Sequence, residues 1–127
     1  MLKTKIRWQT CEPSFASTIV DFRVATWGWL GRKREMVDSM IAFDGICLIL
    51  KGRGTFRVDK GPIHEVIAPC FFHIWPGPRF YYGPEIGTHW EERYLCVDGP
   101  RVEKWRKWGW LRHASIPQAL LSSARCV

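Results

Sequence analysis

The hydrophobic and polar positions of this chain follow a short-strand pattern over most of its length. Apolar runs of about five to eight residues alternate with clusters of Gly and Pro, which is typical of antiparallel strands joined by tight turns. In residues 18–29 apolar and polar positions alternate, as they do in a half-buried strand. Residues 46–51 form a continuous apolar run, which favours a central strand covered on both faces.

The same pattern predicts a full set of strands and the turns between them. The expected strands are residues 18–29, 35–43, 46–51, 55–58, 63–67, 71–75, 79–82 and 89–98. Gly31 and the basic triplet 32–34 should end the first strand at a surface turn. Gly52 and Gly54 should supply a positive-φ hairpin connection between two strands. We therefore expect an all-β sandwich or small barrel.

A helical pattern replaces the strand pattern after Pro100. Val102, Trp105, Trp108 and Leu111 recur every third residue, which places them on one face of a helix. Such an apolar stripe should dock on the barrel, on a partner chain, or on both. Another helical turn is expected within residues 116–124.

These elements predict a single domain in three parts. We assign residues 1–17 to an N-terminal arm, 18–100 to the barrel and 101–127 to a helical C-terminal segment. At 127 residues and 46% hydrophobic content, the chain can bury a substantial core.

Composition adds expectations about location and partners. No apolar run is long enough to span a bilayer, and no signal peptide is visible at the N-terminus. The five cysteines are scattered without a C-x-x-C pair, so we expect reduced thiols in a cytoplasmic protein. The net charge of +7 fits either a basic solvated surface or a nucleic-acid partner.

Candidate chemistry is sparse among the polar residues. The four histidines form no H-x-H or H-E-x-x-H pair, and no nucleophile motif or phosphate loop occurs. A sheet could still bring His64 or His73 together with Glu65, Glu91 or Glu92 around a metal.

Aromatic residues are more informative, since eight of 127 residues are Trp. The rings in or beside predicted strands are Trp27, Trp29, Trp75, Tyr81, Tyr82, Trp90 and Tyr94. Inside a small barrel such rings either stack on a small cyclic ligand or fill the core. The basic stretch 105–108 could likewise clamp single-stranded nucleic acid, or dock as part of the helix stripe.

Residues 44–100 resemble the cupin-like effector-binding and dimerisation domain of AraC-type transcription regulators. The resemblance lies in the strand running into residues 50–56, the corner at 75–77, Tyr82-Gly83, and the stretch from Trp90-Glu91 to residues 97–100. It implies a double-stranded β-helix (jelly-roll) barrel with one or two C-terminal helices. It also implies a small effector, often a sugar, and a homodimer.

The resemblance further implies which residues contact the effector. Aromatic positions of a sugar-sensing member fall on Tyr82 and Tyr94, and its polar clamp falls within residues 34–39, from which we take Arg34 as the expected contact. Trp27 and Trp90 complete the expected ligand-binding set. The helix after the barrel is where the family's dimer contacts lie, so Val102, Trp105, Trp108 and Leu111 form the expected interface.

Two departures shape the functional expectation. The His-x-His pair of metal-binding cupins is missing, and Phe80 stands where a later metal-ligating His would be, so we expect no metal, no other cofactor and no enzymatic activity. The helix-turn-helix units of full-length regulators are also missing, so this chain alone should not recognise a specific DNA sequence. The alternatives are a stand-alone metal-dependent cupin enzyme for a small sugar or acid, and a non-specific nucleic-acid binder.

Overall fold

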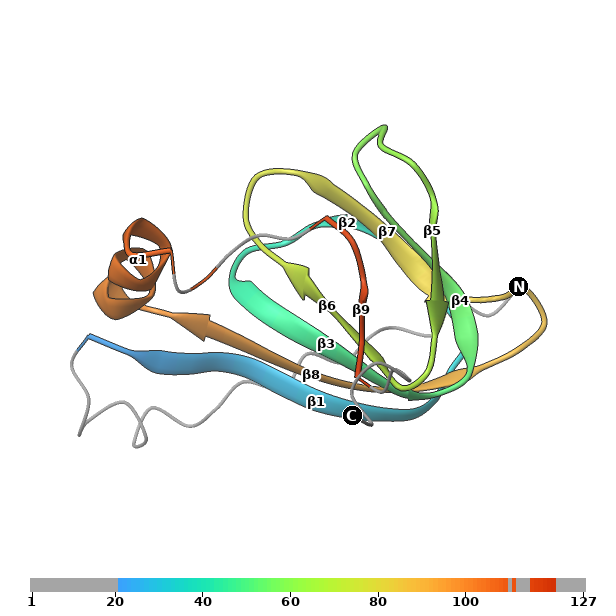
Figure 1. The fold of residues 1–127 in the computed structure, drawn as a ribbon. Helices are drawn as coiled ribbons and strands as arrows, with labels where there is room; N and C mark the ends of the chain where they lie inside the picture. Colours follow the sequence, from blue (N-terminus) through green and yellow to red (C-terminus); the bar gives the residue numbers. More distant parts are fainter. Residues whose placement is uncertain (1–20, 110, 112–114, 121–127) are drawn as a thin grey trace, which may run out of the picture.

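Two antiparallel sheets face each other across a shared hydrophobic core, with one short helix at one end (Figure 1). The computed structural model describes residues 21–109, 111 and 115–120. Sheet A has the order β1-β8-β3-β6-β9, and sheet B has the order β2-β7-β4-β5. The elements are β1 (Arg23–Lys33), β2 (Val37–Met40), β3 (Asp44–Lys51), β4 (Arg53–Val58), β5 (His64–Ile67), β6 (Cys70–Ile74), β7 (Arg79–Pro84), β8 (Trp90–Asp98), α1 (Pro100–Lys107) and β9 (Gln118–Ala119).

The strand order is that of a jelly roll. Strands β1, β3, β6 and β8 lie in sheet A, while β2, β4, β5 and β7 lie in sheet B, so the chain passes repeatedly between the sheets. An eight-stranded double sheet of this kind is the architecture of the cupins. The predicted fold class, an all-β cupin-like barrel, is therefore confirmed.

The first strand extends further than its alternating pattern predicts. β1 continues past Gly31 and ends at Lys33, within the basic triplet, pairing with β8 along its length. Its register with β8 shifts between Leu30 and Lys33. Such an irregularity re-aims the side chains that follow it, and Lys33 is buried. The strand thus ends within the triplet as predicted, but it does not end at Gly31, and Lys33 points inward instead of lying at the surface.

Gly52 does not form the predicted hairpin. The strands on its two sides, β3 and β4, belong to different sheets and do not pair. Gly52 has φ 102°, and a Cβ there would lie 2.7 Å from the Cβ of Trp90. A glycine is thus required where the chain crosses between sheets. Gly54 lies within β4, packed against the backbone of Gly83.

The core fills the space between the sheets with aromatic and aliphatic side chains. The Phe56 and Phe72 ring centroids are 4.5 Å apart, and those of Phe72 and Tyr82 are 4.9 Å apart. Val66 and Ile49 are fully buried beside them. Ile49 and Phe72 belong to sheet A, whereas Phe56, Val66 and Tyr82 belong to sheet B. Every second residue of a strand points inward, so both sheets contribute side chains to the core.

The C-terminal segment is only partly helical. The helix α1 begins at Pro100, whose missing N–H is no loss in a first turn, after Gly99 at φ 120°. Gln118–Ala119 form the short strand β9 beside β6, so the expectation of a helical turn fails there. The predicted arm, residues 1–17, lies outside the described residues.

Candidate functional site

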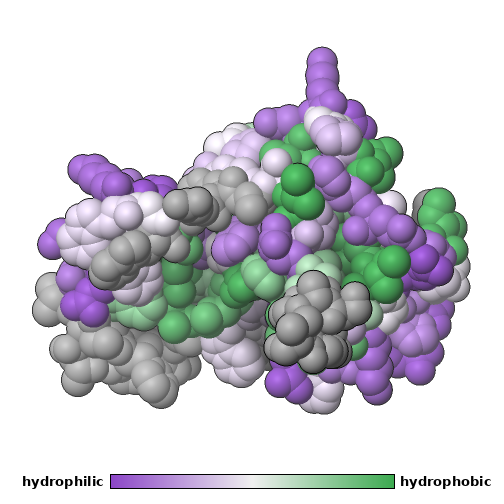
Figure 2. Space-filling view, in the orientation of Figure 1, coloured by the Kyte–Doolittle hydropathy of each residue, from purple (hydrophilic) through white to green (hydrophobic). Residues whose placement is uncertain are grey.

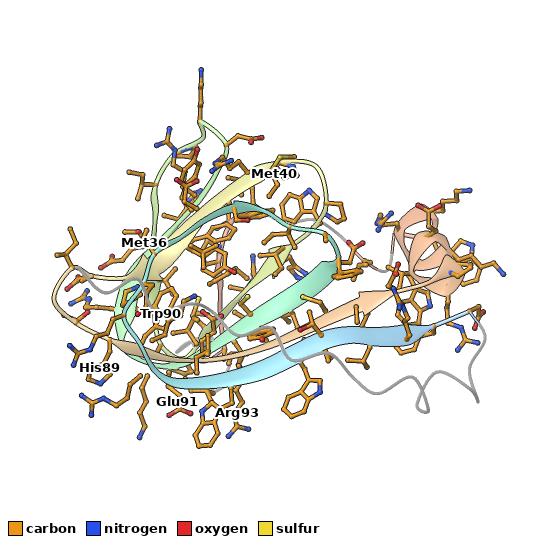
Figure 3. All side chains as sticks on the ribbon, turned by 180° about the vertical axis from the view of Figure 1, so that it is seen from behind. Met36, Met40, His89, Trp90, Glu91 and Arg93 are labelled. Atoms are coloured by element: carbon orange, nitrogen blue, oxygen red, sulfur yellow. The ribbon has the colours of Figure 1, made fainter. Side chains whose placement is uncertain are left out.

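The barrel interior is organised along one face of β8. Trp90, Glu92, Tyr94 and Cys96 alternate with outward residues, and all four are buried. Figure 3 shows Trp90 between the two sheets, whereas Glu91 and Arg93 lie on the other side of β8. This alternation follows from the two-residue period of a strand.

A buried ion pair lies at the Trp90 end of this row. The Lys33 Nζ donates a hydrogen bond of 2.8 Å to the Glu92 Oε1, and the two side chains are only 1% and 3% exposed. The Trp90 Nε1 donates to the same oxygen at 3.1 Å. The Lys33 ammonium also lies 4.7 Å from the centre of the Tyr82 ring. Each charge thus has the partners that burial requires.

The groups around this pair are neutral. Burial raises the pKa of the Tyr82 hydroxyl well above its usual range. Burial, helped by the Glu92 carboxylate, does the same to the pKa of the Cys47 thiol, whose Sγ lies 3.9 Å from the Tyr82 hydroxyl. Lys33 and Glu92 are therefore paired with each other inside a shell of buried, neutral groups and aromatic rings.

Tyr94 on β8 lies over its direct neighbour on β1, Gly28. A Cβ on Gly28 would lie 2.5 Å from the Tyr94 hydroxyl, so the ring lies flat against the glycine backbone. Tyr94 stands between Glu92 and Cys96 on the inner face of β8. It separates the ion pair from the open end of the barrel.

A cavity opens at the Cys96 end of the barrel, and we call it the mouth cavity. Its volume is about 330 Å³, within the range of small-molecule sites. It lies between β1, β8 and the end of β2 with the connection to β3, where Figure 3 labels Met40. Its lining residues are Arg23, Ala25, Thr26, Ser39, Met40, Ile41, Ala42, Phe43 and Cys96.

The polar groups of the mouth cavity adjoin the start of α1. The Arg23 Nη2 donates to the Asp98 Oδ2 at 2.8 Å, which lowers the pKa of the Asp98 carboxyl. Asp98 in turn accepts a hydrogen bond from the backbone N–H of Gly99, directly before α1. Arg106 on α1 pairs with the buried Asp44. Ion pairs thus connect the helix to the cavity end of the barrel.

The predicted ligand-binding residues do not converge on one site. Tyr82, Trp90 and Tyr94 lie in the barrel interior, in the shell of the ion pair and beside Gly28. Trp27 is on the outer face of sheet A, and Arg34 is exposed just after β1. None of the five lines the mouth cavity.

Sequence reasoning missed Arg23, Thr26 and Lys33, and it considered Glu92 only as a possible metal ligand and not as the partner of a buried lysine. Strand alternation places Thr26 on the same face as Gly28, and Glu92 on the same face as Trp90 and Tyr94, but it does not state which face is inside. The burial of Lys33 could not be predicted from the sequence. It depends on the register irregularity between Leu30 and Lys33, and nothing in a run of basic residues indicates such an irregularity.

The predicted dimer stripe is divided by the structure. Val102 is buried, and the Trp105 ring lies 5.4 Å from that of Phe22, so this part packs on the chain itself. Trp108 is 58% exposed at the end of α1. Leu111, after the helix, borders a hollow of about 190 Å³ on the outer side of sheet A with Leu95.

Among the described residues, no group of three or more His, Cys, Asp or Glu side chains could hold a metal ion. In particular, the histidines and glutamates weighed in the sequence, His64, His73, Glu65, Glu91 and Glu92, make no such cluster. The described part of the chain also has no helix long and apolar enough to cross a membrane.

No protein-family model and no curated protein sequence matches this chain. Among solved structures, it is similar to the Clostridium difficile EutQ protein, with a TM-score of 0.47 and 12% sequence identity. The match covers 67% of this chain and 62% of the EutQ chain, so it spans less than two thirds of that protein.

Proposed function

We propose that this chain binds a small molecule in the mouth cavity and acts as a sensory module, such as the effector-binding domain of an AraC-type regulator. The observation that carries the proposal is the cavity itself. It opens between the two sheets, beside the buried side chains of the hydrophobic core.

The lining of the mouth cavity favours a small, largely apolar ligand with one polar or anionic end. Met40, Ile41 and Phe43 supply the apolar wall. Arg23, Thr26 and Ser39 supply the polar side chains, and the Ser39 hydroxyl already donates to the Met40 carbonyl. A few placed polar groups in an apolar wall are the usual composition of such sites. A sugar would need more hydrogen-bonding partners, so a small organic acid is the better candidate.

The position of Arg23 supports a sensory role. A ligand carboxylate that drew Arg23 into the cavity would weaken its pair with Asp98, beside the start of α1. A ligand shifts a conformational equilibrium by its differential affinity for the two states. Ligand occupancy would thereby change how firmly α1 is held on the barrel.

The basic surface offers less support for a nucleic-acid function. Two basic residues of α1 are already paired, Arg101 with Asp21, and Arg106 with Asp44 and Glu103. The salt dependence of any nucleic-acid affinity measures how many phosphates are contacted. We expect weak binding without preference for one sequence.

A thermal-shift screen of small carboxylic acids, sugars and other metabolites tests the proposal. A ligand that binds only the folded chain raises its melting temperature with concentration. Arg23→Gln should weaken the shift given by an acid. Arg53→Gln is the matched control, because Arg53 is also a half-exposed, ion-paired arginine but lies on β4, away from the cavity.

A second variant tests the location. Ala42→Trp would fill the cavity from an exposed position and should abolish the shift, whereas Ile86→Trp, at a fully exposed position outside it, should not. A ligand whose shift survives Ala42→Trp would place the site elsewhere. A screen with no hit across these classes would contradict the proposal.

A further inference from the structure

The outer faces of the two sheets differ sharply in character. The outward side chains of sheet B are largely polar or charged, as expected of a face in water; they include Asp38, Thr55, Arg57, Glu65 and Tyr81. Sheet A instead presents Trp27, Trp29 and Leu95, which are 47%, 62% and 42% exposed. Figure 2 shows hydrophobic residues gathered over β3 and β8 beside α1.

The register joins these outward residues into a continuous surface. Trp27 faces Leu95, and Leu95 faces Ile46 on β3. In the next row, Trp29 faces Arg93, and Arg93 faces Leu48. We call these six residues, Trp27, Trp29, Ile46, Leu48, Arg93 and Leu95, the sheet A patch. Since directly opposed side chains lie about 5 Å apart, the patch is unbroken across three strands.

The charges beside the patch are balanced. Arg93 lies over the Trp29 ring, 5.4 Å from its centre, and the Trp29 Nε1 donates to the Glu91 carboxylate at 3.3 Å. Glu91 and Arg93 lie two residues apart on this face and carry opposite charges. The patch therefore has no excess positive charge that would attract nucleic acid, although the whole chain has a net charge of +7. Because Arg93 covers the Trp29 ring, that ring is no open platform for a sugar.

We propose that the sheet A patch is the interface with a second copy of this chain, packed sheet against sheet about a two-fold axis. In such an interface the same surface meets itself, so Glu91 of each copy can face Arg93 of the other. An apolar centre with Trp and Arg is the composition of interface hot spots. The proposal does not depend on any ligand in the mouth cavity.

The patch also adjoins the helix stripe predicted to dimerise. Leu111 and Leu95 border the same hollow, so the chain just after α1 meets the edge of the patch. Val102 is buried and Trp105 packs against Phe22 within the chain, so little of this part of the stripe is left for a partner. The dimer contact therefore shifts from the helix to the sheet.

Sedimentation equilibrium of the full chain tests the proposal. We expect a dimer, and we expect Trp27→Glu to raise its dissociation constant by about 30-fold or more, the loss of one hot spot of about 2 kcal/mol. Ile67→Glu is the matched control, an exposed apolar residue on a strand of sheet B. Trp108→Glu should likewise leave the dimer intact.

A wild-type chain that is monomeric at high micromolar concentration would overturn the proposal. So would dissociation by Trp108→Glu alone, or a Trp27→Glu dimer as tight as the wild type. If Trp27→Glu melts early, Arg93→Glu replaces it, because Arg93 is an exposed residue. The double variant Glu91→Arg/Arg93→Glu should then recover the dimer, and its failure to do so would contradict the two-fold pairing.

Discussion

Lys33 and Glu92 form an ion pair inside the barrel, 2.8 Å apart and almost completely shielded from solvent. They come from β1 and β8, the neighbouring strands of sheet A that lie furthest apart in the sequence. Taking two charges out of water is costly, and only close geometry with further hydrogen bonds compensates for it. The Trp90 indole supplies one such bond.

Removing one partner of the Lys33–Glu92 pair should destabilise the protein strongly. We expect Lys33→Met to lower the free energy of unfolding by about 3–5 kcal/mol, because it leaves the Glu92 carboxylate buried without a cation. Urea unfolding followed by fluorescence measures the change. The double variant Lys33→Met/Glu92→Gln should recover most of the loss, since it removes both charges and keeps an acceptor for Trp90. A single variant as stable as the wild type would show that the pair is open to water.

Alkaline pH should weaken the barrel through its buried thiols. Burial, with the nearby Asp44 and Glu92 carboxylates, raises the pKa of Cys96 from 9.0 to about 11. The folded state therefore favours the neutral thiol, and this contribution is intact below pH 9 and is lost as the pH rises to about 11. The two-unit difference corresponds to about 2.7 kcal/mol at most.

Unfolding curves measured from neutral pH to about pH 11 check this expectation. Cys96→Val should show a smaller decline than the wild type, while the two should run parallel near neutral pH. Part of the decline should remain, because the pKa values of Cys47 and Tyr82 are also raised by burial. An identical decline in Cys96→Val would contradict the assignment.

Gly28 should tolerate no side chain as long as Tyr94 lies against it. A Cβ there would come within 2.5 Å of the Tyr94 ring and hydroxyl, so we expect Gly28→Ala to cost about 1–3 kcal/mol through overpacking. Gly31→Ala, on the same strand, is the control, because the nearest atom to its Cβ would be 4.0 Å away. Thermal unfolding of the two variants gives the comparison. Equal melting temperatures would mean that Tyr94 moves aside freely.

We expect no stoichiometric metal in the purified protein. The prediction rests on the sequence, which has no His-x-His pair and has Phe80 where metal-binding cupins carry a later histidine ligand. Element analysis for Fe, Mn, Ni and Zn after mild purification measures it. One tightly bound ion per chain would revive the metal-dependent cupin enzyme as the function.

The strands themselves could be predicted because their signals are local. Alternation and Gly or Pro breakers located most of them, including the long β8 and the turn after Val58. Local signals do not state which strands pair. A tight hairpin and a crossing between sheets would each require a glycine at position 52. The sequence is therefore the same for both connections, and only the tertiary fold shows that this one is a crossing.

The candidate site was harder to predict for a related reason. Alternation places Trp27 and Trp29 on one face of β1 and Thr26 and Gly28 on the other, but it does not state which face is inside. In the structure the face with Trp27 and Trp29 is the outer one. Sheet A carries hydrophobic residues on both of its faces, so hydrophobicity alone does not identify the inner face. Aromatic content alone therefore pointed to Trp27 as a ligand contact, whereas the mouth cavity adjoins Thr26.

The jelly-roll order has a consequence for how this chain acquires its structure during synthesis. Among the described strands, only β4 and β5 are neighbours both in the sequence and in a sheet. The pairing of Arg23 with Asp98 joins residues 75 positions apart, so sheet A cannot be completed until β8 has left the ribosome. Non-local pairings of this kind slow folding. Nascent chains that stop before β8 would leave apolar strands β1 and β3 without their shared partner, and unpaired strand edges of this kind are prone to aggregation.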